Sequence, residues 1–315
     1  MDCGNKSVSP PPPLMAYPAL GCLYTGNLRD MSEEAKQHCV MVSAFDGWND
    51  ACSASTNVIR HLLEAYDSHE VGNIHGEGFY DYQMSRPMLC HVQGRRRIVW
   101  PATKFYRVRI NASLTLLLEM GPEPNYRWTD FCRQSIHMAE DYEVDSIITL
   151  GSMFADCPHT RPLPMDDLAG DQACMDTDGH SGPIGIPTVL DSLAAQDGYT
   201  TESVWVSVPQ YLGSDECAQA TLQLLERLSS MLGVGLERGH LPHKAEEWKA
   251  QAAVLLHCND DLAGYVHRLE MEADKQSADR MNMQVDEPTA HELVKEAEDF
   301  LRSMGDKGQG GNSNG

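Results

Sequence analysis

Apolar residues along the chain follow two alternating patterns. Short runs that are almost entirely apolar predict buried strands, and they span residues 39–45, 113–120, 145–150 and 202–208. Segments with an apolar residue every three or four positions predict amphipathic helices, and they span residues 51–65, 129–139, 186–195 and 215–232. Strands that alternate with helices in this way predict an α/β domain with a mainly parallel sheet, covered by helices on both faces.

Two stretches interrupt the alternation. Residues 70–110 contain short extended pieces at 88–92 and 97–100, separated by Gln93-Gly94, and predict a hairpin-like excursion. The acidic stretch 166–180 is expected to be a loop.

The sequence also indicates where the helices begin. Asn49 or Asp50 is expected to cap the first helix and Thr129 the second, while Pro187 fits the first turn of the third.

The chain divides into four expected parts. Residues 1–35, with the prolines at 10–13, are expected to be a loosely ordered lead-in, and 36–242 form the α/β domain. A helix is expected at 243–275. The tail at 276–315 is expected to be largely disordered, with a short helix at 287–304 and no apolar residue from 305 onwards.

Residues 244–273 contain no proline and have apolar residues at alternating spacings of three and four, which predicts one long helix with a heptad seam. Its d positions would be Trp248, Leu255, Leu262 and Leu269, and its a positions Ala252, Asn259 and Val266. A buried Asn at an a position fixes register and oligomer state, so we expect self-association through this seam. The alternative is a helix that packs on its own domain, with Asn259 facing water.

Charge and cysteine content narrow the possible partners and compartments. The formal net charge is −22, which disfavours nucleic acid and anionic membrane surfaces. The 10 cysteines contain no C-x-x-C pair and several lie in apolar runs, as reduced thiols of a cytosolic protein do. No signal-peptide pattern and no run of eighteen apolar residues is visible, so we expect a cytoplasmic protein with no membrane span.

Polar and aromatic residues follow the predicted parallel strands, whose carboxyl ends meet at one edge of the sheet. The candidate residues of this rim are Asp46, Trp48, Asn49, Glu123, Asn125, Arg127, Trp128, Asp156, His159 and Arg161. One interpretation is a site for a small molecule or an anion, with two arginines and two helix N-termini. The alternative is structural: Trp48 and Trp128 are core aromatics, and Asp46 or Asp156 pairs with Arg127 or Arg161 to hold the loops.

Signatures of catalysis and of metal or cofactor binding are absent from the sequence. It has no nucleophile elbow, no phosphate-binding loop, no dinucleotide-binding glycine motif and no H-E-x-x-H. The 13 histidines and the cysteines show no metal-ligand spacing, so we expect no metal and no cofactor. His159 is the histidine that lies beside acids and an arginine in a loop. It would be the first choice for an acid or base if the protein were an enzyme.

The loop sequences resemble the proteasome assembly chaperone family, second type, in its actinobacterial branch. The resemblance lies in AFDGWNDA (44–51), YDYQMSRP (80–87), WPAT (100–103), EPNYRW (123–128), LGS (150–152), PHTRP (158–162), GPIGI (182–186) and WVSVP (205–209). Together with the helix at 248–269, it covers residues 36–273. The chain departs from the family pattern in its short acidic 166–181 loop, at 213–217, and beyond residue 275, where the hydrophobic-Tyr-X ending that inserts into proteasome pockets is missing.

This resemblance implies a three-layer α/β/α fold, similar to nucleoside phosphorylases and hydrolases, and homo-oligomers. For archaeal and eukaryotic relatives, the resemblance implies that the protein assists the assembly of the proteasome. We therefore expect a non-catalytic protein-binding factor of the assembly-chaperone type, with itself and another protein as partners. The alternative from a different class is a small-ligand-binding protein, or a hydrolase- or phosphorylase-like enzyme that uses the carboxyl-edge loops. A deep closed pocket at the rim would favour the alternative, and a shallow packed surface would favour the binding factor.

Overall fold

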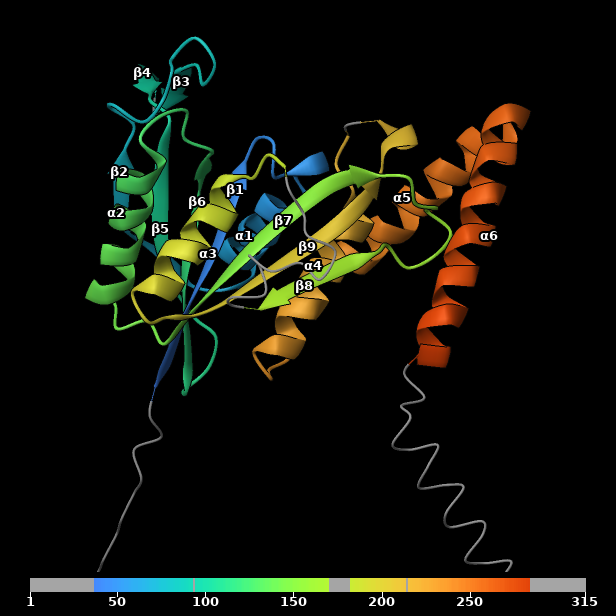
Figure 1. Cartoon of the computed structure of the whole chain (residues 1–315). Coiled ribbons are helices and arrows are strands. Elements are labelled where there is room, and N and C mark those ends of the chain that lie inside the picture. Colours follow the sequence, from blue (N-terminus) through green and yellow to red (C-terminus); the bar gives the residue numbers. More distant parts are fainter. Residues whose placement is uncertain (1–36, 93, 170–181, 214, 284–315) are drawn as a thin grey trace, which may run out of the picture. The chain divides into compact units, whose positions relative to one another are not determined.

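The computed structural model describes residues 37–92, 94–169, 182–213 and 215–283. Within them, seven strands form one sheet in the order β2-β5-β6-β1-β7-β9-β8 (Figure 1). They are β1 (His38–Asp46), β2 (Ser68–His75), β5 (Ala102–Arg109), β6 (Leu114–Pro122), β7 (Ser146–Ala155), β8 (Met165–Ala169) and β9 (Thr200–Pro209). The central strands β6, β1, β7 and β9 run parallel, which confirms the predicted mainly parallel sheet.

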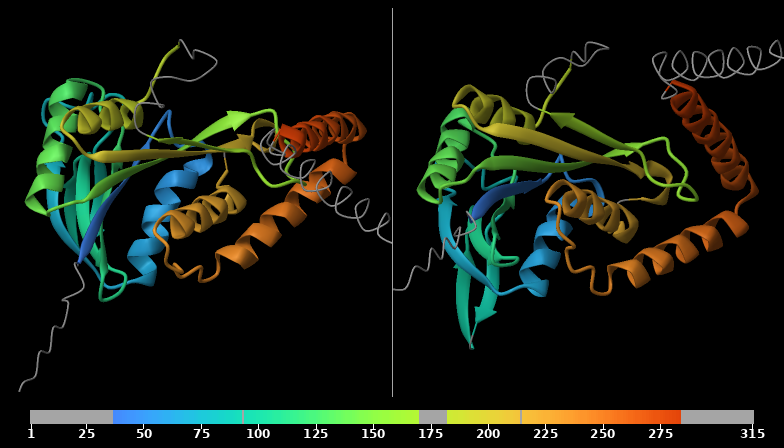
Figure 2. Two further views of the ribbon diagram at one scale, coloured as in Figure 1. Left: turned by 60° about the horizontal axis from the view of Figure 1, so that its bottom comes forward. Right: turned by 90° about the horizontal axis from the view of Figure 1, so that it is seen from below.

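Helices cover both faces of the sheet (Figure 2). One face carries α1 (Ala54–Ala65), α4 (Ala218–Met231) and α5 (Leu241–His257), and the other carries α2 (Trp128–Asp141) and α3 (Ile186–Gln196). Successive residues of β1 serve the two layers in turn. Val40 and Val42 pack into the α1–α4–α5 core, while Met41 and Phe45 pack into the α2–α3 core. This double burial explains why the central strands are apolar at nearly every position, and it confirms the α/β/α fold.

Local sequence explains where most helices begin. Helix α1 begins at Ala54, later than expected, and its N-cap position is Ser53. Asp50 nevertheless satisfies its first turn, because Asp50 Oδ1 accepts hydrogen bonds from the backbone N–H of Ser55 at 2.8 Å and of Thr56 at 3.2 Å. Pro187 lies in the first turn of α3, also as expected. The expected cap at Thr129 is wrong. Helix α2 already begins at Trp128, and the residue before it, Arg127, adopts the left-handed conformation with φ 55°.

The excursion at 70–110 contains more sheet than its sequence indicated. The predicted hairpin is confirmed as a separate two-stranded ribbon, β3 (Met88–Val92) and β4 (Arg95–Val99). On either side of it, β2 and β5 extend the main sheet as antiparallel strands, which the sequence analysis missed. The acidic loop was also only partly predicted, because Met165–Ala169 pairs with β9 as the antiparallel strand β8. Residues 170–181 lie outside the described part.

A long C-terminal helix is confirmed as α6 (Asp260–Met283), but the expected unbroken helix across 244–273 is wrong. The chain leaves the helix after His257 and starts α6 at Asp260. Asn259 lies in this break, exposed, and its Oδ1 accepts the backbone N–H of Leu262 at 3.1 Å. It therefore caps α6 instead of filling a buried a position. Helix α6 then continues past residue 275, where we expected it to end.

The predicted heptad positions differ in burial between α5 and α6. On α6, Val266 and Leu269 are buried within the chain and Leu262 is half-buried. On α5, Ala252 is buried and Trp248 packs against the α1–α4–α5 core, but Leu255 is exposed. No continuous seam is left for a partner helix. The expectations for residues 1–35, 287–304 and 305–315 concern segments outside the described residues.

Candidate functional site

The loops after β1 and β6 are joined through the carboxylate of Glu123. Its Oε1 accepts a hydrogen bond from Asn49 Nδ2 at 2.7 Å and another from the backbone N–H of Ile186 at 2.9 Å. The second bond places a negative charge at the N-terminus of α3, where the helix dipole favours it. The backbone N–H of Glu123 also donates to the carbonyl of Asp46 at 2.8 Å. One carboxylate therefore ties three elements of the carboxyl edge together.

Asn49 is completely buried behind this carboxylate. Its backbone carbonyl accepts the N–H of Ser152 at 2.8 Å, which extends the network to β7. Gly185 is required beside it, because a Cβ at that position would lie 1.6 Å from Asn49 Oδ1. Asn49 Nδ2 and Glu123 thus hold loops together, while Asn49 Oδ1 is buried and has no hydrogen-bond partner among the described residues. This loop-holding role of Asn49 and Glu123 was not predicted from the sequence.

The β6–α2 loop is also held by internal contacts. The Asn125 Oδ1 accepts the backbone N–H of Asp81 at 2.8 Å, and Trp128 Nε1 donates to the carbonyl of Pro124 at 2.6 Å. Arg127 pairs with Asp130, at 3.0 Å between Nε and Oδ2, and its guanidinium lies over the ring of Phe79. The structural interpretation expected Arg127 to pair with Asp46 or Asp156, and this expectation is wrong. Trp128 is half-buried against the core, as that interpretation expected.

Asp156, His159 and Arg161 belong to a second network, which fastens α6. Asp156 Oδ1 accepts the hydroxyl of Tyr265 at 2.7 Å, and Arg161 donates two bonds to Asp274, at 2.8 and 2.9 Å. The guanidinium holds the pKa of Asp274 below its usual range. The expected pairing of Arg161 with Asp46 or Asp156 is therefore wrong. The loop between β7 and β8 is instead the surface on which α6 lies (Figure 1).

His159 is only 2% exposed and lies between Tyr211 and Trp248. The Tyr211 hydroxyl oxygen accepts the backbone N–H of His159 at 2.8 Å and lies 2.7 Å from its Nδ1. The hydroxyl proton can then be donated to Nδ1, which suits a neutral imidazole. Burial lowers the pKa of His159, against an opposing effect of Glu270. A neutral, packed imidazole with this partner is a structural histidine.

The ten rim residues therefore follow the carboxyl ends of the strands, but nine of them are divided between two networks and Trp48 belongs to neither. The reason is the length of β7. Its pairing with β1 ends at Ala44–Leu150, whereas its pairing with β9 continues to Ala155–Pro209. At about 3.3 Å per residue, this extension carries Asp156 and the residues after it well beyond the ends of β1 and β6. Sequence spacing predicted the common edge, but not this separation.

Apolar side chains at the same edge point outward. Trp48 is 65% exposed, so its expected role as a core aromatic is wrong. Other large exposed apolar residues lie near the end of β7 (Met153 and Phe154), after β6 (Tyr126) or before α3 (Ile184). We call the set the carboxyl-edge surface: Trp48, Tyr126, Met153, Phe154 and Ile184. Met153 and Phe154 were not predicted from the sequence. They are exposed because β7 extends beyond the end of β1, and the sequence does not show how far one strand extends past another.

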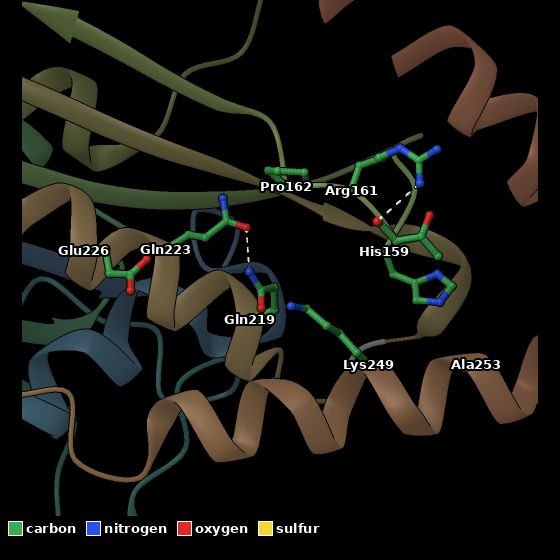
Figure 3. Close-up of a pocket in the computed structure, with 9 residues that line it drawn as sticks. His159, Arg161, Pro162, Gln219, Gln223, Glu226, Lys249 and Ala253 are labelled. Carbon is green, nitrogen blue, oxygen red and sulfur yellow. Dashed lines mark hydrogen bonds between the residues drawn. The ribbon is translucent and has the colours of Figure 1, made fainter. Parts of the chain in front are cut away.

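A pocket of about 660 Å³ lies beside the second network (Figure 3). Its lining residues come from the β7–β8 loop, α4 and α5: His159, Thr160, Arg161, Pro162, Gln219, Gln223, Glu226, Lys249 and Ala253. The side chain of Lys249 lies across it from the β7–β8 loop, and Gln219 Oε1 is a buried acceptor with no partner among the described residues. Several charges are already paired, Lys249 with Glu246 at 3.0 Å among them.

Two further carboxyl groups are completely buried between the sheet and the α2–α3 layer. Glu119 on β6 accepts the hydroxyls of Ser43 at 2.7 Å and of Ser135 at 2.6 Å. Asp191 on α3 accepts the hydroxyl of Thr149 at 2.8 Å. Burial raises the pKa of each carboxyl to about 7, although the hydroxyl donors oppose the shift. They lie inside the fold and not at its carboxyl edge.

Comparison with known proteins identifies the family. A family model described as the PAC2 family matches residues 44–256. A PAC2 family protein from Streptomyces avermitilis is 33% identical, with a TM-score of 0.67 over 72% of this chain and 99% of that chain. A proteasome-assembly chaperone homologue from Mycobacterium tuberculosis is 34% identical, with a TM-score of 0.66 over the same shares. The chain belongs to the PAC2 family.

More distant structures share the fold alone. A Pyrococcus furiosus protein described as an archaeal proteasome activator is 12% identical, with a TM-score of 0.56 over 70% of this chain and 94% of that chain. No curated protein matches the chain. Within the described residues, no helix is long and apolar enough to cross a membrane. Among the same residues, no group of three or more His, Cys, Asp and Glu side chains could hold a metal ion.

Proposed function

We propose that this protein is a non-catalytic binding factor of the assembly-chaperone type, which works as a homo-oligomer in the cytoplasm. The carboxyl-edge surface is the observation that carries the proposal. Trp48, Tyr126 and Ile184 stand on loops, and Met153 and Phe154 stand on the end of β7. The hydrogen bonds of Glu123 brace the loops after β1 and β6 and the start of α3. A rigid scaffold that presents apolar anchors suits a protein partner, because aromatic residues in such positions contribute most of the energy of interfaces.

In this proposal the rim residues have two roles. Trp48 contacts the partner, while Asn49, Glu123, Asn125, Arg127 and Trp128 hold the loops that present it. Asp156, His159 and Arg161 hold α6 beside the β7 end of the same edge. The family supports a proteasome-related partner, since its Mycobacterium member is described as a proteasome-assembly chaperone homologue.

The test is cross-linking and purification from the protein's own cells, with wild type compared with the double variant Trp48→Ala, Phe154→Ala. Val254→Ala is the matched control, because Val254 is equally exposed but lies on α5. The expected result is a partner that the control retains and the double variant loses by about tenfold or more. Equal recovery of the same proteins by all three chains would contradict the proposed surface. If the partner is a proteasome subunit, the purified protein should speed particle assembly from separate subunits.

The pocket beside α4 and α5 favours a second candidate function, the binding of a small ligand. It contains His159 and Arg161, two of the predicted rim residues, and the unpartnered Gln219 oxygen. Inorganic phosphate and simple nucleosides are the probes to use, with binding measured by calorimetry. Lys249→Met should then weaken binding, while Lys244→Met, on the exposed side of α5, should not. Absence of heat with every probe would favour the protein-binding function.

A further inference from the structure

The ribbon β3–β4 and the residues at its base form an arm outside the main sheet. We define the arm as residues 82–92 and 94–101. Figure 1 shows β3 and β4 standing beyond the ends of β2 and β5. All five residues of β4 are exposed, and in β3 all but Cys90 are exposed. A ribbon of two strands is at best marginally stable in water, so an arm exposed on both faces indicates that something covers it.

The base of the arm is apolar on both faces. Register places Met88 opposite Val99 on one face and Leu89 opposite Ile98 on the other. These four side chains are between 47% and 65% exposed. Trp100 is exposed next to them, with its ring 4.8 Å from that of Tyr82. An apolar patch of this kind, with tryptophan and methionine, has the composition of an interface core.

The outer half of the arm is basic. Arg95, Arg96 and Arg97 follow one another on β4, and register places Arg96 opposite His91. With Arg86, the arm holds four of the chain's 24 Lys and Arg residues, and the stretch 82–101 contains none of its 46 Asp and Glu residues. The arm is therefore a positive projection on a strongly negative protein. Its complement is an acidic surface with apolar residues beside it.

The chain itself supplies the acidic part of such a surface. Exposed carboxylates lie on the described body, for example Glu140, Asp141 and Glu143 at the end of α2. Pairing of two arms with each other is disfavoured, because it would bring two sets of arginines together without an acidic residue in either arm. A second copy can offer its body to the arm of the first. Local charge complementarity between the basic arm and the acidic body favours this arrangement, in which unlike surfaces meet, against the repulsion between two chains of net charge −22.

We propose that the arm of one copy docks on the acidic body of a second copy, head to tail. The apolar base lies against apolar surface of the neighbour, and the arginines lie against its carboxylates. The inference deepens the self-association part of the proposed function and rests on it. A head-to-tail contact joins different surfaces, so it closes into a ring when the rotation allows and otherwise extends into a filament. Neither the ring nor the filament requires the heptad seam predicted for residues 244–273.

The first test is the mass of the full chain by sedimentation at micromolar concentration. Wild type should sediment as an oligomer, and the double variant Leu89→Glu, Ile98→Glu should sediment as a single chain. Val254→Glu is the matched control and should remain oligomeric. Since the first variant could disturb the arm itself, the triple variant Arg95→Glu, Arg96→Glu, Arg97→Glu provides a second measurement. It should weaken association by about tenfold or more, and high salt should weaken that of wild type.

A single-chain mass for wild type, or an unchanged oligomer in both arm variants, would overturn the inference. Partner capture by the carboxyl-edge surface would be unaffected by that outcome, so the two failures are distinguishable. The second test places a photo-cross-linker at Trp100 in a mixture of unlabelled and isotope-labelled chains. Cross-links from the arm of one chain to the body of the other support the proposal. Cross-links between arms, to another protein, or to residues 1–36 or 284–315 of the same chain overturn it.

Discussion

At the scale of single residues, Glu119 shows how a buried carboxyl can be tolerated. Ser43 lies opposite it in the β1–β6 register, and Ser135 reaches it from α2. These hydroxyls satisfy both oxygens, but burial still disfavours the charged form. Glu119 and Asp191 therefore lower the stability of the native state when both are ionised. Their effect on stability depends on pH near neutrality.

The sign follows from the raised pKa. Glu119 keeps its proton up to a pKa of about 7 in the folded chain, whereas its ordinary value is 4.5. Between these values the folded state binds more protons than the unfolded state, so stability falls as pH rises. The substitution Glu119→Gln removes this titration. Its stability relative to wild type should increase by roughly 2 kcal/mol between about pH 5 and pH 8.

The measurement is urea unfolding of both chains at the two pH values. Gln can accept one serine hydroxyl and donate to the other, so the local packing is kept. Glu272→Gln is the control, because Glu272 is an exposed glutamate on α6 and its substitution should leave the difference between the two pH values unchanged. A constant difference between wild type and Glu119→Gln would show that the carboxyl is already ionised at about pH 5.

At the scale of elements, the sequence predicted those strands that are buried on both faces of the sheet. The central strands are apolar at nearly every position because both helix layers pack on them, so their pattern is unambiguous. Strand β2 has the sequence SHEVGNIH and is half-exposed, so neither alternation nor a continuous apolar run marks it. Strands β2, β5 and β8 form because a neighbouring strand offers backbone partners. That information is not local, and the sequence pattern could not supply it.

The candidate site was predictable to a similar degree. Parallel topology placed the loops at a common edge, but which side chains meet there depends on how far each strand extends. For His159, the deciding contact is Tyr211, which the chain supplies 52 residues later. Asn259 shows the same limit in a helix. Its heptad position was compatible with a buried seam, yet the side chain caps the following helix, as Asn does at helix starts.

Helix α6 makes a prediction at this scale. Leu269 is buried on the side of α6 that faces the body, whereas Met271 is exposed. Replacing Leu269 with Ala removes apolar contacts and should lower the protection of α6 amides against hydrogen exchange by about 2 kcal/mol. Met271→Ala removes a side chain of similar size from water and should change protection little. Equal effects of the two substitutions would mean that α6 is held mainly by Arg161, Asp156 and their partners.

At the scale of the whole molecule, most of the exposed large apolar side chains among the described residues lie in two places with different character. The carboxyl-edge surface lies on loops that are braced by Glu123 and Asn49 and on the end of β7. The arm lies at the ends of β2 and β5 and adds four arginines to its apolar base. A surface held by a rigid network suits a partner that binds without rearrangement. A positive arm on an acidic protein suits a copy of that protein.

If the two surfaces have separate partners, one substitution in each should separate their effects. Trp48→Ala should lose the captured partner and keep the mass of wild type, whereas Trp100→Ala should shift the mass toward a single chain. Both residues are exposed tryptophans, so each variant is the matched control of the other. Sedimentation and cross-linked capture are measured on the same preparations. Loss of both properties in Trp48→Ala alone would mean that one surface serves both partners, because an interface is built around a few anchors and fails when one is removed.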